Sequence, residues 1–290
     1  MIFKKVIKRK RTTERKPDPE NPVSVMISSD LSFGQQWLKR KGVRRLVLNT
    51  HDGLKLHGYF VPSLRPTKKL VILVHGFGTD ARMMAKYGMM YQQMDYDIFL
   101  ADSRAHGDSE GKYVGMGWLD RIDYLQWTDF LLNDLGTERQ IIFHGVSMGG
   151  ATVLMMSGEQ LPPQVKAIIS DSAYTSASDQ ISYLIKSLFH LPTFPLLNLA
   201  EAKTKRKAGY GLREAIAIRQ VRKSITPILF IHGGADLYTP TNMAHQLFDS
   251  TICPKKLLIV PGAKHAMSYN DAPEIYEATI RNFIDQYISN

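Results

Sequence analysis

The 290-residue sequence contains one cysteine, Cys253, and no group of cysteines and histidines with the spacing of a zinc site. A single thiol cannot close an intrachain disulfide, which excludes a small disulfide-stabilised scaffold. All apolar runs are shorter than the roughly 20 residues that a membrane-spanning helix needs. No signal peptide is recognisable, so the cytoplasm is the expected compartment.

Negative charge is also in short supply, with 27 Asp and Glu against 37 Lys and Arg and a formal net charge of +10. Residues 1–16 hold eight Lys or Arg and one Glu, so they carry seven of these ten charges. The rest of the chain is nearly neutral, and we expect no specific binding of nucleic acid.

The basic residues 1–16 are expected to form a solvated, mobile arm. The alternative is weak contact with the inner membrane surface, because apolar residues could form a stripe beside the lysines. These residues are Ile2, Phe3, Val6 and Ile7. Residues 17–22 contain three prolines, which predicts a linker without regular structure. We therefore assign residues 1–22 to the arm and linker, and residues 23–290 to one domain that begins with a helix over residues 24–40.

After this helix come two β-rich runs, Val43–Thr50 and Leu54–Val61, separated by a short turn that contains Gly53. This pattern is typical of an antiparallel hairpin. Short apolar runs then follow, nearly continuous rather than alternating, as in strands buried on both faces. They are Leu70–Val74, Ile98–Ala101, Gln140–Phe143, Val165–Ser170, Pro227–Ile231 and Lys256–Val260. Most are separated by enough chain for a helix, which predicts an α/β fold with a mostly parallel, doubly wound sheet.

One connection is much longer than its neighbours, since more than about 50 residues separate Ser170 from Pro227. It contains Phe and Leu residues broken by Pro192 and Pro195. Long insertions in compact domains are usually functional, so we expect a helical cap over about residues 172–222, above the carboxyl edge of the sheet. The alternative is a surface elaboration without a role.

The strongest chemical signal is the segment His144-Gly-Val-Ser147-Met-Gly-Gly150, which directly follows an apolar run and precedes a run of helix formers. A strand that turns sharply into a helix strains its central residue and crowds the side chains two positions away, where glycine is therefore needed. Such a turn lifts the serine hydroxyl above the sheet. Ser147 is therefore predicted to be a nucleophile rather than an ordinary turn serine.

A serine hydroxyl needs a base to remove its proton, and the base needs an acid to orient it. Asp236 follows the run that ends at Ile231, and His265 follows the run that ends at Val260. Parallel strands place both loops at the same carboxyl edge as Ser147. We therefore predict Ser147, Asp236 and His265 as the catalytic residues, with Asp171 as the alternative acid.

An acyl-transfer enzyme also needs donors for the oxyanion. The backbone N–H of Met148, next to the nucleophile, is one candidate, and that of Phe77 in the loop His75-Gly-Phe-Gly78 is the other. The loop lacks the continuation of a phosphate-binding loop, and no acidic residue supports a dinucleotide site. We expect neither a cofactor nor a metal.

The segments HGFG, ADSRAHGDSEG, GVSMGG, HGGAD and PGAKH, in this order, resemble the α/β-hydrolase superfamily. The resemblance extends over roughly residues 43–288. It points to the bacterial esterase-like branch related to serine aminopeptidases and prolyl-oligopeptidase-type hydrolases. Ala105 stands where the family's D-x-R-G-H-G-x-S loop usually has glycine, and the resemblance implies that this loop braces the site rather than reacting.

The expected function is that of a serine carboxylesterase acting on small-molecule esters with apolar short to medium acyl or alcohol groups, since the cap is rich in Phe and Leu. A thioesterase, an acyl transferase or an aminopeptidase could use the same residues. For a peptidase, neither Glu201 nor Glu214 of the cap can be assigned to hold a free amine. The alternative from another class is a catalytically silent binding protein on a hydrolase fold.

Overall fold

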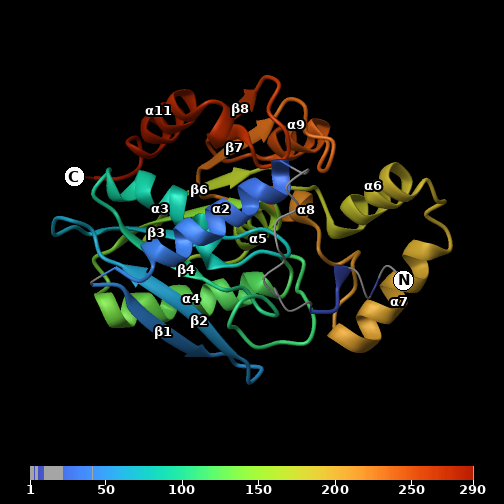
Figure 1. Cartoon of the computed structure of the whole chain (residues 1–290), viewed down its shortest axis with the longest axis horizontal. Coiled ribbons are helices and arrows are strands. Elements are labelled where there is room, and N and C mark those ends of the chain that lie inside the picture. Colours follow the sequence, from blue (N-terminus) through green and yellow to red (C-terminus); the bar gives the residue numbers. More distant parts are fainter. Residues whose placement is uncertain (1–2, 4–5, 10–21, 41, 290) are drawn as a thin grey trace.

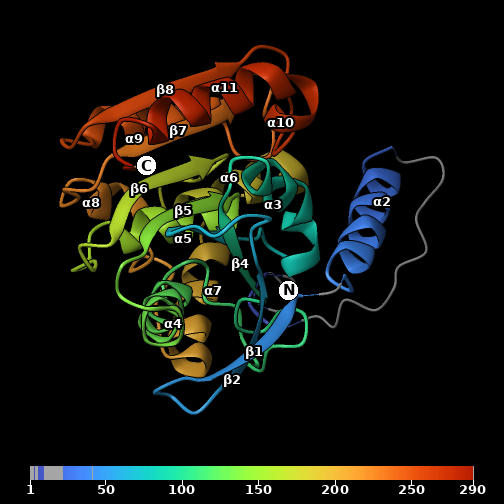
Figure 2. The ribbon, with the colours of Figure 1, turned by 90° about the vertical axis from the view of Figure 1, so that its left-hand side faces the viewer.

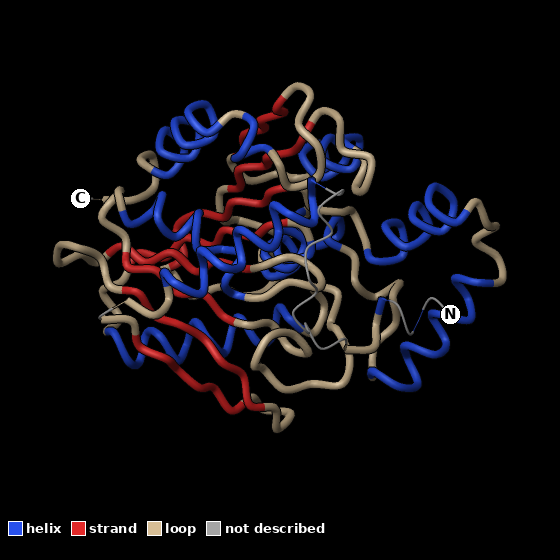
Figure 3. Tube along the Cα trace, viewed as in Figure 1, coloured by secondary structure: helices blue, strands red, loops and turns tan. Residues whose placement is uncertain are grey.

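The computed structural model of the chain describes residues 3, 6–9, 22–40 and 42–289. A single eight-stranded sheet forms the central layer, with helices on both faces (Figures 1 and 3). The strands are β1 (Arg44–Asn49), β2 (Lys55–Val61), β3 (Lys69–Val74), β4 (Asp97–Ala101), β5 (Gln140–Val146), β6 (Val165–Asp171), β7 (Ile228–Gly233) and β8 (Lys255–Val260).

The strand order is β1-β2-β4-β3-β5-β6-β7-β8. The β1–β2 and β2–β4 pairs are antiparallel and the other five pairs are parallel. The predicted hairpin and the predicted parallel sheet are both confirmed. The carboxyl ends of β5, β6, β7 and β8 consequently meet at one edge, as the site prediction requires.

The helices are α2 (Pro22–Trp37), α3 (Ala85–Gln92), α4 (Asp120–Leu135), α5 (Met148–Met156), α6 (Ala177–Phe189), α7 (Leu196–Ala208), α8 (Ala217–Val221), α9 (Thr241–Ser250), α10 (Ser268–Asp271) and α11 (Pro273–Ile284). A 3-10 helix, η1, covers Ala81–Met84. No helix among the described residues has the length and apolarity needed to cross a membrane.

Two hydrophobic cores lie on the two faces of the sheet, because successive strand residues point to opposite sides. Ile72 and Phe143 belong to the core that includes residues of α4, α5 and α8. Val71 and Ile142 belong to the core that includes residues of η1, α3 and α11. Figure 2 shows α2 outside α3 on this second side, where Trp37 is buried.

The predicted linker is one residue too long, because Pro22 is already the first residue of α2. Backbone N–H groups in the first turn of a helix have no acceptor within the helix. Proline, which lacks this N–H, is therefore tolerated there. Residues 17–21 lie outside the described residues. The helix ends at Trp37, three residues before the predicted end.

The long connection between β6 and β7 contains α6, α7 and α8. In Figure 1, α6 and α7 project from the body of the molecule at one end of the sheet. The side chains of Gln180 and Tyr183, both in α6, donate hydrogen bonds to the carbonyl oxygens of Tyr238 and Leu237, at 2.8 and 3.0 Å. The insertion therefore reaches the loop that carries Asp236.

The N-terminal arm was expected to be solvated, but its described residues pack against the body of the protein. Phe3 is 6% exposed and Ile7 is fully buried. Backbone hydrogen bonds join this segment to residues 112–114, since Val114 N–H donates to Ile7 O and Arg9 N–H donates to Lys112 O. The ring of Phe3 lies 5.7 Å from that of Tyr113. Phe3 and Ile7, two of the four residues that could form an apolar stripe for membrane contact, are therefore buried.

Candidate active site

Ser147 lies between the last residue of β5 and the first residue of α5, with φ 57° and ψ −117°. Glycine is needed two positions before and two positions after Ser147, because a Cβ there would collide with backbone atoms. A Cβ at Gly145 would lie 2.1 Å from the carbonyl oxygen of Gly149, and a Cβ at Gly149 would lie 2.0 Å from that of Val74. The predicted crowding around a sharp strand-to-helix turn is therefore present.

The structure brings the three predicted catalytic side chains together. Ser147 Oγ lies 2.8 Å from Nε2 of His265, and Nδ1 of His265 lies 2.7 Å from Oδ2 of Asp236. Asp236 comes from the loop after β7 and His265 from the loop after β8. A hydroxyl, an imidazole and a carboxylate thus form a continuous hydrogen-bonded chain.

The Asp236 carboxylate accepts several further hydrogen bonds. Backbone N–H groups of Tyr238 and Thr239 donate to Oδ1, at 2.9 and 2.8 Å. Nε2 of the buried His232 lies 3.2 Å from Oδ2. Burial alone would raise the pKa of Asp236, but the hydrogen bonds from His232 and His265 outweigh burial and hold this pKa well below 3.8. Asp236 is therefore a fixed negative charge behind the imidazole.

Asp171, the alternative acid, does not hydrogen-bond to His265. Its carboxylate accepts hydrogen bonds from Ser172 Oγ and Tyr276 OH instead, at 2.8 and 2.9 Å. The side chain that faces Nδ1 of His265 is Asp236.

The two predicted oxyanion donors lie on segments next to Ser147. Met148 is the following residue, and a Cβ at Gly76, beside Phe77, would lie 3.3 Å from Ser147 Cβ. The loop is braced by His106, whose Nε2 accepts the N–H of Gly78 at 3.2 Å. Burial lowers the pKa of His106 to about 3, so this ring is neutral and can accept the bond.

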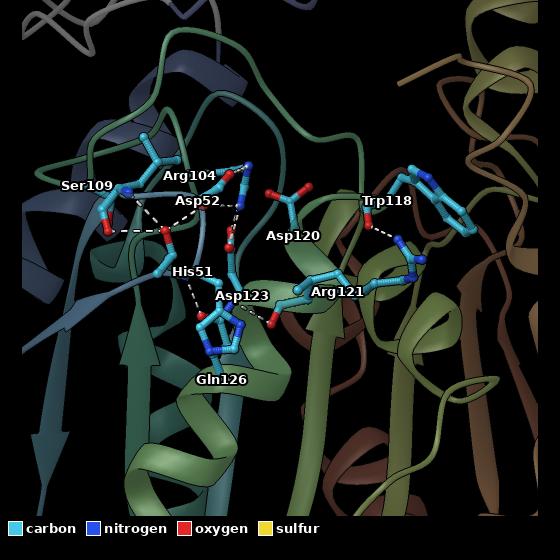
Figure 4. Close-up of polar contacts among 12 residues, drawn as sticks. His51, Asp52, Arg104, Ser109, Trp118, Asp120, Arg121, Asp123 and Gln126 are labelled. Atoms are coloured by element: carbon cyan, nitrogen blue, oxygen red, sulfur yellow. Dashed lines mark hydrogen bonds and ion pairs between the residues drawn. The ribbon is translucent and has the colours of Figure 1, made fainter. Parts of the chain in front are cut away.

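A buried ion pair anchors the segment that contains His106 (Figure 4). The guanidinium of Arg104 contacts both carboxylate oxygens of Asp123, at 2.6 and 2.5 Å, and Oδ2 of Asp52 at 2.9 Å. In the same region His51 N–H donates to the side chain of Gln126 at 2.9 Å. These contacts fix the 102–109 loop between the β1–β2 hairpin and α4, which agrees with a bracing role.

Sequence reasoning missed several residues around the site. The ring of Tyr238 lies 4.8 Å from that of His265, and Tyr276 approaches from α11. His232, near the end of β7, is a further partner of Asp236 that the sequence analysis does not predict. Its position at the end of the strand, four residues before Asp236, is the signal that could have identified it. No cluster of metal-ligating side chains occurs in the described part of the chain.

The family model described as "Serine aminopeptidase, S33" matches residues 65–210, which is half of the chain. An uncharacterized protein of Bacillus subtilis, YqkD, is 29% identical over 82% of this chain and 78% of its own length. Mouse monoglyceride lipase is 23% identical over 80% of this chain and 86% of its own.

Two solved structures share the fold. The Pyrococcus furiosus esterase Pf2001 has a TM-score of 0.72 at 18% identity and covers 97% of this chain and 100% of its own. Est1E of Butyrivibrio proteoclasticus, solved with ferulic acid bound, has a TM-score of 0.66 at 24% identity and covers 84% of this chain and 100% of its own. The chain therefore belongs to the α/β-hydrolase superfamily, within the family described as serine aminopeptidase, S33.

Proposed function

We propose that the protein is a serine hydrolase that cleaves carboxylic esters through an acyl-enzyme on Ser147. The observation that carries the proposal is the hydrogen-bonded chain Ser147–His265–Asp236, with 2.8 and 2.7 Å between the bonded atoms. These distances lie within the range in which a base can take the proton of a nucleophile.

In the first half of the reaction, Ser147 Oγ attacks the ester carbonyl carbon while its proton passes to Nε2 of His265. Asp236 keeps the Nδ1 proton in place and stabilises the imidazolium. The backbone N–H groups of Phe77 and Met148 are the proposed donors to the oxyanion. The tetrahedral intermediate then collapses, the carbon–oxygen bond to the alcohol breaks, and His265 returns the proton to the leaving alcohol.

In the second half, His265 removes a proton from water, and the resulting hydroxide attacks the acyl carbon. The second intermediate expels Ser147 Oγ, which recovers a proton from His265, and the carboxylic acid leaves. Both halves use the same base and require no redox partner.

The proposed substrates are esters with an apolar acyl or alcohol group. The cap supplies Phe and Leu residues, and two similar proteins are named as an esterase and a monoglyceride lipase. An aminopeptidase would need an acidic side chain to bind a free amine. Glu201 of the cap accepts the N–H of Arg213 at 3.1 Å, and Glu214 lies 3.7 Å from Lys205 Nζ. An aminopeptidase therefore stays the alternative that aminoacyl-anilide substrates test.

The test combines a fluorophosphonate probe with a series of p-nitrophenyl esters of increasing chain length, alongside acyl-CoA and aminoacyl-anilide substrates. We expect labelling of the wild-type protein, highest kcat/KM on the esters, and a loss of about 10⁴-fold or more in Ser147→Ala. Ser29→Ala, at an exposed serine of α2, is the matched control and should be unaffected. Labelling that persists in Ser147→Ala contradicts the proposal, and a folded wild-type protein without labelling or turnover indicates a silent binding protein.

A further inference from the structure

Three residues around the site share a backbone conformation that is rare for residues with a side chain. Ser147, Ser172 and Ala266 have φ values of 57°, 56° and 57°. They follow β5, β6 and His265, respectively. A positive φ is costly when a Cβ is present, so surrounding contacts must hold these residues in place.

The pair Asp171–Ser172 connects all three positions. The carbonyl oxygen of Asp171 accepts the N–H of Ser147 at 2.8 Å. The hydroxyl oxygen of Ser172 accepts the N–H of Ala266 at 3.2 Å and donates its own proton to Asp171 Oδ1 at 2.8 Å. Ser172 N–H also donates to Ile231 O, at the end of β7, at 2.9 Å. One dipeptide therefore links the proposed nucleophile to the residue after the proposed base.

The second oxygen of Asp171 is held by a chain of buried side chains. Tyr276 OH donates to Oδ2 at 2.9 Å and lies 3.0 Å from Nε2 of His144, whose Nδ1 lies 3.2 Å from Tyr91 OH. Asp171, Tyr276, His144 and Tyr91 are all fully buried. Burial lowers the pKa of His144 to about 3, so the ring is neutral and carries one proton.

Burial raises the pKa of Asp171, and the hydrogen bonds from Ser172 and Tyr276 oppose this rise. With Asp171 ionised, one arrangement of protons satisfies the chain. Since Tyr276 gives its proton to the carboxylate, its oxygen must accept from Nε2–H of His144, and Nδ1 of His144 then accepts from Tyr91 OH. Each donor has one acceptor, and both Asp171 oxygens have a donor. A fully satisfied buried network of this kind rigidifies its surroundings.

We infer that Asp171, Ser172 and Tyr276 are positioning residues that keep His265 within hydrogen-bonding distance of Ser147. This inference rests on the proposed function. Asp171 is not the acid of the site, because Asp236 occupies that place. It acts through Ser172 Oγ on the backbone of Ala266, and through its own carbonyl oxygen on the backbone of Ser147. Tyr276 keeps the carboxylate oriented so that Ser172 can face Ala266.

The principal test is Ser172→Ala, which removes the acceptor for Ala266 N–H but leaves Ser147, His265 and Asp236 unchanged. A displacement of about 1 Å can cost roughly 100-fold in rate, so we expect kcat on a p-nitrophenyl ester to fall about 10- to 100-fold. KM should stay within about twofold, because no substrate contact is removed. The proton NMR signal of the His265 Nδ1–H, which lies far downfield when bonded to Asp236, should broaden.

Tyr276→Phe is the second variant, since it keeps the ring and removes only the hydroxyl. We expect a smaller loss of kcat, about three- to tenfold, again with little change in KM. Its matched control is Tyr269→Phe, whose hydroxyl bonds to Glu277 at 2.8 Å and not to the network. Ser157→Ala is the stability control, because its buried hydroxyl donates to Leu154 O at the far end of α5.

The positioning role is overturned if kcat of folded Ser172→Ala and Tyr276→Phe stays within about twofold of the wild type. It is also overturned if Ser157→Ala loses as much kcat as Ser172→Ala, since the effect would then follow stability alone. A failure of the proposed function gives a different result, namely activity that survives in Ser147→Ala.

Discussion

The ring of Tyr238 lies 4.8 Å from the imidazole ring of His265, with an angle of 46° between the two planes. The backbone of the same residue donates to Asp236 Oδ1, and its carbonyl oxygen accepts a hydrogen bond from Gln180 in α6. Tyr238 therefore contacts the proposed base, the proposed acid and the insertion. It is one residue through which the position of α6 can affect the chemistry.

We expect Tyr238→Ala to lower kcat of ester hydrolysis about two- to tenfold. An aromatic contact of this kind is worth about 0.5–1.5 kcal/mol, and its loss leaves one side of the imidazole unsupported. Tyr238→Phe keeps the ring and should retain wild-type kcat. Steady-state kinetics on one p-nitrophenyl ester separates the two variants, and equal losses would mean that the hydroxyl rather than the ring matters.

The hydrogen bonds to Asp236 predict how stability depends on pH. The pKa of this carboxyl is lowered in the folded protein, so its ionised form contributes stability above about pH 4 that is lost as the pH falls below the ordinary pKa of 3.8. Asp236→Asn cannot ionise. The variant should be less stable than the wild type at pH 6, and the difference should shrink towards pH 3.

Urea unfolding at pH 6, 5, 4 and 3 measures this difference in the free energy of unfolding. Ile225→Ser is the matched control, since it alters a 90% exposed side chain and no ionisable group. Its difference from the wild type should be the same at each pH. If the difference in the free energy of unfolding between Asp236→Asn and the wild type does not change with pH, the ionised form of Asp236 is not stabilised in the folded protein.

The two acidic partners of Arg104 should contribute unequally to stability. The side chain of Asp123 is 1% exposed and that of Asp52 is 54% exposed, while Arg104 is 8% exposed. Breaking a buried pair by removing one partner costs about 3–5 kcal/mol, because the other charge stays buried without compensation. An exposed pair contributes about 0–1 kcal/mol.

We therefore expect Asp123→Asn to lower the free energy of unfolding by up to about 3 kcal/mol. Asp52 still lies 2.9 Å from Arg104 in this variant, and burial already raises the pKa of Asp123 to about 7. We expect Asp52→Asn to lower the free energy of unfolding by at most about 1 kcal/mol. Chemical denaturation of the two variants at pH 7 gives both values directly. Similar losses in both would mean that Arg104 is held by its surroundings as a whole rather than by Asp123.

The central part of the fold could be predicted because its signals are local. Continuous apolar runs fix buried strands, and the glycines around Ser147 mark a turn in which a Cβ would strike backbone atoms. Asp236 and His265 follow from the topology, since each lies in the loop after a parallel strand. The structure brings these side chains within hydrogen-bonding distance of one another.

The residues around these three could not be predicted, because their contacts join elements far apart in the chain. Tyr276 lies 105 residues from Asp171 and 132 from His144, and no spacing rule relates these positions. The packing of the N-terminal arm could not be predicted for the same reason. Its apolar period is visible in the sequence, but the surface that covers Phe3 and Ile7 comes from residues 112–114 and α7.

The packing of the arm gives the last prediction. Ile7 is fully buried and belongs to the same core as Ile72, whereas its neighbour Lys8 is exposed. Truncation of a buried isoleucine to alanine costs about 2–5 kcal/mol. Ile7→Ala should therefore lower the free energy of unfolding by about that amount, and Lys8→Ala should change it by less than about 0.5 kcal/mol. Urea denaturation of the full-length protein measures both, and a neutral Ile7→Ala would show that the arm leaves the body in solution. Its apolar side chains would then be available to another surface, whereas a large loss means that they already complete the fold.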